Sequence, residues 1–276
     1  MSRISLFAMA GALLASSLNV YANTSKSDAV PDSMTVYAEY EHEYEKLPSI
    51  GGSTARTLTA DGLRIGVDKV SSWYAVGGNV RARRTVGFLG AGFRQLDIDA
   101  KGTSFTVYGA LQPTPGFFVG LGGKLDYDTG LAIGRVGTLD VTVTSVGVRP
   151  FVAVVIPTDD WRFDGSLGVD FSRTRIAFQG SRVTYSRVFE GLLDTKVSVP
   201  LSDIFTASAG AKARHLFRED VSLNGTQRDL WAADAHVGLT AALSKNQSLR
   251  FQARTRLFDA VEDSAEFHLR FSHKFD

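Results

Sequence analysis

Hydrophobic and polar residues alternate with a period of two along much of this chain. The clearest case is residues 247–258, QSLRFQARTRLF, where apolar residues and threonine alternate with glutamine and arginine. The same pattern recurs in residues 161–172, 231–241 and 265–275. Successive side chains of a β-strand point to opposite faces, so this pattern predicts strands with one oily and one polar face.

Eight further segments alternate less regularly, and we expect strands at residues 34–44, 58–68, 73–83, 105–112, 117–127, 139–156, 183–199 and 205–214. The last of these, FTASAGAKAR, has helical propensity, but it follows a turn and keeps the period of two. The total is about twelve strands. An even number of this size fits an all-β fold, a closed antiparallel transmembrane β-barrel.

The connections between these strands alternate in length. Every second one is short and rich in turn formers, as in DKVSS, PTPG, PTDD, PLSD and SKNQ. The others are mostly longer, at residues 45–57, 84–103, 128–138, 176–182 and 215–227. Short periplasmic turns and longer extracellular loops are typical of bacterial outer-membrane barrels. In loop 84–103, the apolar stretch VGFLGAGF predicts either insertion into the lumen or extension of the flanking strands.

Alternation alone is also compatible with a secreted β-sandwich, whose oily face is inside. Strands of about ten residues suit a tilted membrane crossing, whereas strands of soluble proteins are shorter. Aromatic residues at the strand ends suit interfacial girdles: Tyr44, Trp73, Tyr74, Tyr127, Trp161 and Trp231. We therefore expect the apolar face to meet lipid and the polar face to line a wet lumen.

The amino terminus has the features of an export signal. Arg3 precedes the apolar run 4–14, and Val20 and Ala22 form a small-residue cleavage site. We expect a signal peptide at 1–22, a short disordered leader at 23–33 and the barrel at 34–276. The net charge of +1 predicts no nucleic-acid partner, and the lack of cysteine argues against a small disulfide scaffold. The expected location is the bacterial outer membrane, with its lipid as the surrounding partner.

Charged residues on the polar faces are the main candidate for function. Arginine presents a planar fork of donors suited to carboxylates and phosphates, so a row of cations predicts a track for small anionic solutes. The expected cations are Arg162, Lys212, Arg214, Arg250, Arg254, Arg256, Arg270 and Lys274. Acidic residues are expected in the same lumen: Glu39, Glu41, Asp164, Asp170 and Glu266.

Internal ion pairs that brace the barrel are the alternative role for these charges. If the first and last strands pair, Glu39 falls opposite Arg270 and Glu43 opposite Glu266. Across the last hairpin, Arg256 is expected near Glu266.

The sequence predicts no catalytic, metal or cofactor site. His236 and His268 are expected in the lumen, with Asp234 and Glu266 two residues away, but no serine joins them in a recognisable pattern. The five histidines are scattered without ligand spacing. We expect structural histidines and no enzyme activity.

Two segments carry a resemblance to a known family. SFTVYGALQPTPGFFVGLGGKLDYDTG, residues 104–130, and WRFDGSLGVDFSRTRIA, residues 161–177, resemble the hairpins of autotransporter translocator barrels. The final strand, Phe267 to Phe275, resembles the terminal strand that the outer-membrane assembly machinery reads, although Asp276 follows the aromatic residue. The arginine row and AEYEHEYEK at Ala38 are similar to twelve-stranded channels for acidic oligosaccharides.

These observations predict a passive outer-membrane channel for small polar or anionic solutes. An autotransporter would carry a passenger before its barrel, whereas only residues 23–33 precede the first expected strand, so a stand-alone barrel is expected. A structural or secretion barrel, or an adhesin with a plugged lumen, is the alternative. An outer-membrane lipid hydrolase is the third possibility.

Overall fold

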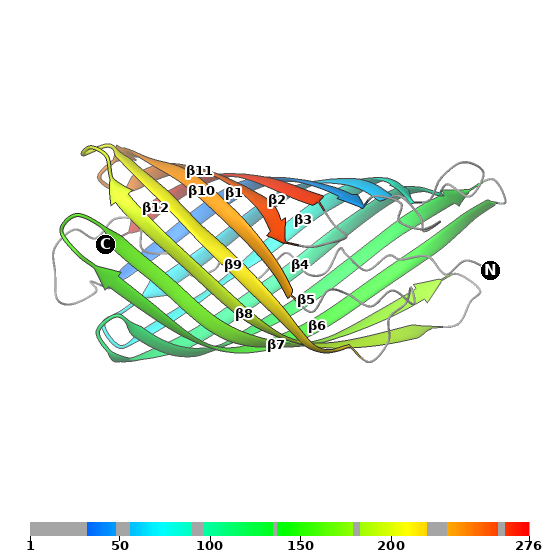
Figure 1. Ribbon diagram of the computed structural model, residues 1–276, viewed down its shortest axis with the longest axis horizontal. Coiled ribbons are helices and arrows are strands. Elements are labelled where there is room, and N and C mark those ends of the chain that lie inside the picture. The colour runs from blue at the N-terminus through cyan, green and yellow to red at the C-terminus, as the bar shows by residue number, and fades with distance from the viewer. Residues whose placement is uncertain are drawn as a thin grey trace.

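The computed structural model describes residues 32–47, 56–89, 96–134, 137–178, 183–219, 231–258 and 263–275. The expected signal peptide and most of the expected leader lie outside these residues. The described chain forms twelve strands (Figure 1): β1 (Ser33–Leu47), β2 (Arg56–Val70), β3 (Tyr74–Leu89), β4 (Leu96–Thr114), β5 (Phe117–Gly134), β6 (Gly137–Pro157), β7 (Arg162–Phe178), β8 (Thr184–Pro200), β9 (Phe205–Glu219), β10 (Trp231–Ser244), β11 (Gln247–Phe258) and β12 (Asp263–Phe275).

The strands form one closed antiparallel barrel, as the sequence predicts. Each strand pairs with its neighbours in sequence, and β1 also pairs with β12. This closing ladder runs without a register shift from Met34 opposite Phe275 to Lys46 opposite Asp263. Closure leaves no sheet edge, so the backbone donors and acceptors along the ladder pair within the barrel, as hydrocarbon surroundings require. Among the described residues, no helix is long and apolar enough to cross a membrane.

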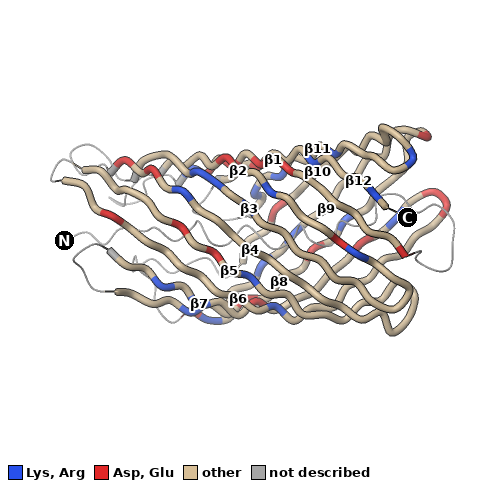
Figure 2. Tube along the Cα trace, turned by 180° about the vertical axis from the view of Figure 1, so that it is seen from behind, with Lys and Arg blue, Asp and Glu red and all other residues tan. Residues whose placement is uncertain are grey.

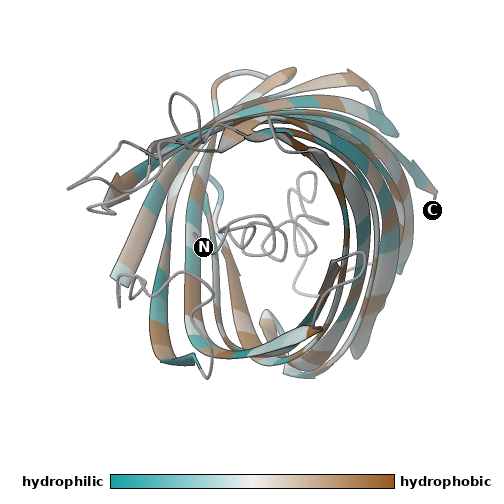
Figure 3. Ribbon diagram, turned by 90° about the vertical axis from the view of Figure 1, so that its right-hand side faces the viewer, coloured by the Kyte–Doolittle hydropathy of each residue, from teal (hydrophilic) through white to brown (hydrophobic). Residues whose placement is uncertain are grey.

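The two faces of the barrel differ as expected. On β11, Phe251 and Leu257 are exposed on the outside, at 48% and 53% of their surface. Arg250, Arg254 and Arg256 alternate with them and point into the lumen, where each is partly buried. Charged residues of both signs occur along the strands (Figure 2), and hydropathy changes along each ribbon (Figure 3). A barrel whose large apolar side chains point outward matches a lipid environment.

The connections have the predicted asymmetry, although the long ones are shorter than expected. At one end they comprise residues 71–73, 115–116, 158–161, 201–204 and 245–246. At the other end they comprise 48–55, 90–95, 135–136, 179–183, 220–230 and 259–262.

The predicted loop 84–103 is wrong for most of its length. β3 continues to Leu89 and β4 begins at Leu96, so the flanking strands are extended, and only residues 90–95 connect them. The outward side chains of this part of β4 include Asp97, Asp99 and Lys101. A ladder held by backbone hydrogen bonds does not need an apolar outer face, so the strands persist where the two faces are reversed, with Ile98 and Ala100 inward.

Two lumen-facing aromatic rings lie over glycines on the neighbouring strand. Tyr37 is opposite Gly66, and a Cβ built on Gly66 would lie 2.4 Å from the ring carbon Cζ. Tyr108 is opposite Gly77 in the same way, with 2.6 Å to Cε1. The absence of a side chain at these glycines lets each ring lie flat against the wall.

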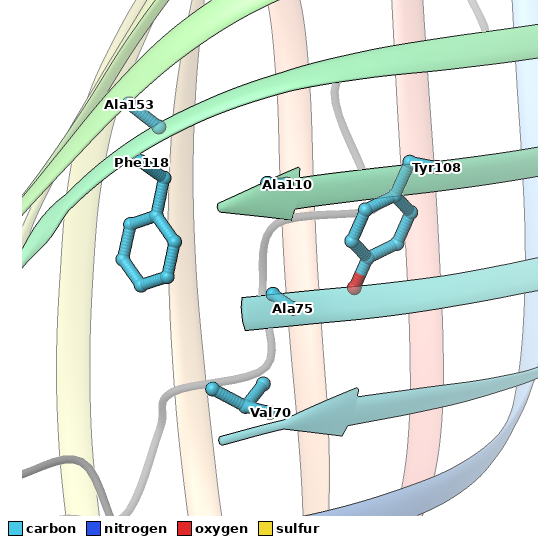
Figure 4. Packing of buried hydrophobic residues seen from close by; sticks show 6 residues of the cluster. All are labelled: Val70, Ala75, Tyr108, Ala110, Phe118 and Ala153. Atoms are coloured by element: carbon cyan, nitrogen blue, oxygen red, sulfur yellow. The ribbon is translucent and has the colours of Figure 1, made fainter. Parts of the chain in front are cut away.

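Two apolar clusters cover parts of the lumen wall. Near the short-turn end, six buried side chains from β2 to β6 pack together (Figure 4): Val70, Ala75, Tyr108, Ala110, Phe118 and Ala153. Near the opposite end, a second cluster joins Leu58, Ile98, Ala100, Ala132, Val141 and Ile176. Phe118 is 1% exposed and Ile176 is 0% exposed, although both belong to the inward-facing set. The charged part of the lumen therefore lies between two apolar regions.

Candidate functional site

The predicted charged residues fall on the inner face of the barrel. The register gives the basic set this orientation: Arg162, Lys212, Arg214, Arg250, Arg254, Arg256, Arg270 and Lys274. The acidic set shares the lumen: Glu39, Glu41, Asp164, Asp170 and Glu266. The strand alternation thus predicts the positions of these side chains, which come from strands far apart in sequence.

The densest group of charges lies at the β1–β12 seam. Arg270 Nε donates a hydrogen bond to Glu39, which lies directly opposite, and Arg64 Nη1 is 3.3 Å from the same carboxylate. Glu39 is 3% exposed and Arg270 is 7% exposed. The Arg270 guanidinium also lies 4.1 Å above the Tyr37 ring. The seam is therefore braced by a buried, multiply bonded ion pair.

Glu41 extends this group to the next two strands. It pairs with Arg64 of β2 and with Arg81 Nε of β3 at 2.5 Å. On the other side of the seam, Glu266 accepts a hydrogen bond from Arg254. The cluster spans five neighbouring strands, from β11 through β12 and β1 to β3.

Ion pairs continue around the rest of the lumen. They are Arg83–Asp128 at 3.0 Å, Lys124–Asp126 at 2.7 Å, Arg149–Asp170 at 2.9 Å, Arg162–Asp164 at 2.6 Å, Lys196–Asp164 at 3.1 Å, Arg214–Glu190 at 3.7 Å and Arg256–Asp234 at 2.8 Å. Most of these pairs join side chains of the same or an adjacent strand, whereas Arg83–Asp128 joins β3 to β5 across Gly102 of β4. This supports a bracing role for these pairs.

The expected pairings are mostly confirmed. Glu39 is opposite Arg270 and Glu43 is opposite Glu266. The expected proximity of Arg256 and Glu266 is wrong. Arg254 lies opposite Glu266 of β12, and Arg256 pairs with Asp234 of β10, the other neighbour of β11. The register of the last hairpin differs by two residues from the expected one. A shift of two keeps every side chain on the same face but changes its partner.

A cavity of about 90 Å³ lies within this charged region. One side of it is formed by Glu39, Glu41 and Glu43, with Arg64 and Arg81 between them. On the other side, the cations Lys196, Lys212, Arg250 and Arg254 outnumber the carboxylates Asp164 and Asp194, and His236 lies beside them. A cavity of this size suits small solutes.

Two cations in the cavity wall lack a carboxylate partner within hydrogen-bond reach. Arg250 Nη2 donates to Gln252 at 2.8 Å, and the residue across the strand pair is another cation, Arg270. Lys212 lies between Asp194 and Asp234 in register. Within the described part of the chain, neither Arg250 nor Lys212 forms an ion pair shorter than 4.0 Å. Arg250 and Lys212 are thus the cations of this wall that no described carboxylate holds within 4.0 Å.

His268 belongs to the charged group at the β1–β12 seam. Its Nδ1 is 3.2 Å from Glu39, and its Nε2 is 3.2 Å from Glu266. Ligand atoms of Glu39, Glu41 and His268 lie within 4.8 Å of one another, as a metal site would require. However, Arg64, Arg81 and Arg270 already supply positive charge to these carboxylates. The donor set fits an ion-pair network better than it fits a cation site.

One polar group on the outer face was missed by the sequence analysis. Asp61 of β2 accepts a hydrogen bond from the Tyr40 hydroxyl at 2.5 Å and lies 2.9 Å from His42 Nδ1. The feature of the sequence that could have revealed this group is a charged residue, Asp61, at an outward position of β2 where an apolar side chain is expected. Among the described residues, His42 forms a hydrogen bond with Asp61 and a ring contact with Phe267, and no hydroxyl group forms a hydrogen bond with it.

This combination of a closed twelve-stranded sheet, an apolar outer face and a charged lumen defines a membrane β-barrel. Solved structures agree. The translocator domain of the autotransporter NalP from Neisseria meningitidis superposes with a TM-score of 0.70 at 13% identity, over 88% of each chain. The β-domain of the Bordetella autotransporter BrkA gives 0.64 at 17% identity, over 88% of this chain and 100% of that one.

An outer-membrane channel from Pseudomonas putida F1 is also similar, with a TM-score of 0.54 at 10% identity, over 92% of this chain and 100% of the channel. Neither a protein-family model nor a curated protein sequence matches this chain. The resemblance to autotransporter barrels is therefore confirmed for the fold. At these identities it does not extend to activity.

Proposed function

We propose that this protein is a bacterial outer-membrane channel of low conductance that passes small anions. The long connections would face the exterior, and both ends of the barrel domain would face the periplasm. The similarity to barrels of outer membranes supports this location. We also propose that the outer-membrane assembly machinery recognises Phe267 to Phe275 of β12 through the outward-facing aromatic and apolar side chains of this segment.

The observation that carries the proposal is the unequal charge of the two cavity walls. The acidic residues Glu39 and Glu41 are each engaged by at least two guanidinium groups, so that wall attracts cations weakly. Arg250 and Lys212 on the other wall have no carboxylate within 4.0 Å among the described residues. An anion that enters the cavity would gain hydrogen bonds from the cationic side chains of Arg250 and Lys212. The small cavity favours inorganic or short carboxylate anions over oligosaccharides.

Planar-bilayer recording of the full-length protein tests this proposal. In a salt gradient, the reversal potential of the wild-type channel should indicate anion preference. The double variant Arg250→Gln with Lys212→Gln should lose most of that preference, because it removes both available cations. Arg84→Gln, which lies on the outer face, is the matched control and should leave the reversal potential unchanged. Cation preference of the wild-type channel would overturn the proposal.

A filled, translocator-like barrel is the second candidate, and the apolar clusters favour it. Side chains that line an open aqueous pore are wet, whereas Phe118 and Ile176 are excluded from solvent on the inner side of the barrel. A filled lumen would give no steady current in the same recordings. If the lumen is filled, Phe118→Asp should loosen the packing and produce current. An open channel would show current without the substitution.

A further inference from the structure

The outer face of β2, β3 and β4, which are consecutive in the barrel wall (Figure 1), contains an apolar groove of about 690 Å³. Its walls include exposed side chains from all three strands: Ile65, Val67, Val76, Val80, Phe105 and Val107. These side chains belong to the outward-facing set of their strands. The groove therefore opens toward lipid and is separate from the charged cavity of the lumen.

Gly78 forms the floor of this groove. Val67 of β2 and Val107 of β4 lie directly opposite it on either side. Val76 and Val80 precede and follow it on the same face of β3. The lack of a side chain at Gly78 leaves a hollow that these four valines enclose. Because β-branched side chains are stiff at χ1, the walls of the hollow keep their shape.

A lysine lies at the short-turn end of the groove. Lys69 is directly opposite Val76, so its backbone is roughly 7 Å from that of Gly78 along the strand direction, at about 3.3 Å per residue. Its Nζ lies 5.9 Å from the centre of the Tyr74 ring. Within the described ranges, Lys69 has no carboxylate within 4.0 Å, and the residue opposite it on β1 is Met34. No described carboxylate therefore competes with an external anion for this charge.

Two aromatic residues place this end of the groove at the surface of the hydrocarbon layer. Trp73 is exposed, and its ring contacts that of Tyr74 edge to face with 4.5 Å between the ring centres. Tryptophan and tyrosine of membrane barrels lie where hydrocarbon meets lipid headgroups, and a long lysine side chain extends to the same level. The groove thus begins at headgroup height with a positive charge and continues into the hydrocarbon layer as an apolar hollow.

We propose that this groove binds one anionic glycerophospholipid, with its phosphate at Lys69 and one acyl chain over Gly78. The phosphate diester accepts a charge-assisted hydrogen bond from the lysine ammonium group. A second copy of this chain fits the groove less well, because a two-fold contact between barrels inserted in the same direction places both Lys69 side chains at the same height. The proposal requires only that the outer face meets lipid, and it is independent of whether the lumen conducts.

Native mass spectrometry of the full-length barrel in detergent tests this site, with phosphatidylglycerol and phosphatidylcholine of the same acyl chains as probes. The wild-type barrel should bind phosphatidylglycerol more tightly, because the phosphatidylcholine headgroup carries its own cation. Lys69→Gln should weaken phosphatidylglycerol binding roughly tenfold, the value of one charge-assisted hydrogen bond, and should remove the preference between the two lipids. Val67→Phe places a ring over Gly78 and should lose most of the binding of both lipids.

Two matched controls separate this site from general lipid contact. Lys245→Gln removes an exposed cation from a turn at the same end of the barrel, and Leu63→Phe adds a ring to the outer face of β2 outside the groove. Both should bind phosphatidylglycerol as the wild type does, and every variant compared should show the heat-modifiable barrel band on gels.

Three results would overturn the proposal. The first is equal phosphatidylglycerol binding by the wild type and Lys69→Gln, a comparison that stands even if Val67→Phe does not fold. The second is an equal loss of binding in Lys245→Gln or Leu63→Phe. The third is a barrel dimer that Val67→Phe dissociates, which would identify a second copy as the occupant of the groove.

Discussion

Glu39 of β1 and Arg270 of β12 lie directly opposite each other where the first and last strands meet, and Arg270 donates a hydrogen bond to Glu39. They are 231 residues apart in sequence. Their bond therefore forms only when the barrel is closed. Both side chains are buried, and Tyr37 lies against the guanidinium. The charge pair and the backbone ladder together hold the seam.

Removal of one partner of this pair should destabilise the barrel. Arg270→Gln leaves Glu39 buried without its opposite partner, a change that costs roughly 3–5 kcal/mol for a buried ion pair. Urea unfolding of the protein in lipid vesicles, followed by tryptophan fluorescence, measures this loss. Glu39→Gln combined with Arg270→Gln should recover part of it, since no uncompensated charge remains. A single variant as stable as the wild type would show that the pair does not brace the seam.

The close approach of Tyr37 to Gly66 gives a second stability prediction. Gly66→Ala places a methyl group against the ring, so Tyr37 and with it the Arg270 contact must move. An overpacked position of this kind costs roughly 1–3 kcal/mol in unfolding free energy. Gly109→Ala on β4 is the control, because the nearest atom to its Cβ would be 3.9 Å away. Equal effects of the two substitutions in the urea assay would contradict the packing argument.

Phe118 should contribute strongly to stability from the inner wall. Its ring is 1% exposed and packs with Val70, Tyr108 and Ala153. Phe118→Ala should lower the unfolding free energy by roughly 3–5 kcal/mol, the usual cost of a large cavity in a packed core. Phe105→Ala on the lipid face, where lipid can fill the space, should cost less. A larger effect at Phe105 would mean that the inner cluster is loosely packed.

The His42–Asp61 pair should not support lipid hydrolysis. It has the base and the orienting acid of a hydrolase, but among the described residues no hydroxyl group forms a hydrogen bond with His42. We expect detergent-solubilised protein to release no fatty acid from phospholipid. Release that disappears in the His42→Ala variant would contradict this and restore the hydrolase hypothesis.

The sequence predicts the number, order and facing of the strands, because a period of two reports directly which side of a strand meets lipid. It also predicts the Glu39–Arg270 pairing, since the antiparallel closure of the first and last strands fixes their register. For residues 84–103 the sequence left two possibilities, insertion into the lumen or extension of the flanking strands, and the second is confirmed. The sequence could not decide between them, because Asp97, Asp99 and Lys101 put the polar side of the alternation outward there.

The ion-pair partners of lumen side chains were harder to predict than the face of the strand on which each side chain lies. A register difference of two residues was enough to exchange Arg254 for Arg256 beside Glu266. The aromatic–glycine contacts depend on which residues lie opposite across a ladder, and single-strand periodicity contains no such information. The apolar inner clusters were unexpected for the same reason. Each combines buried residues from five strands, and each strand contributes only one or two of them.

The sidedness of the barrel is the central claim, and the lack of native cysteine allows a direct test on β11. Single cysteines at positions 249 to 257, spin-labelled in lipid vesicles, can be probed for collision with oxygen, which concentrates in lipid, and with a water-soluble nickel complex. We predict high oxygen accessibility at 249, 251, 253, 255 and 257, and low oxygen accessibility at the four positions between them. The opposite phase, or no alternation, would contradict a barrel that is apolar outside and charged within.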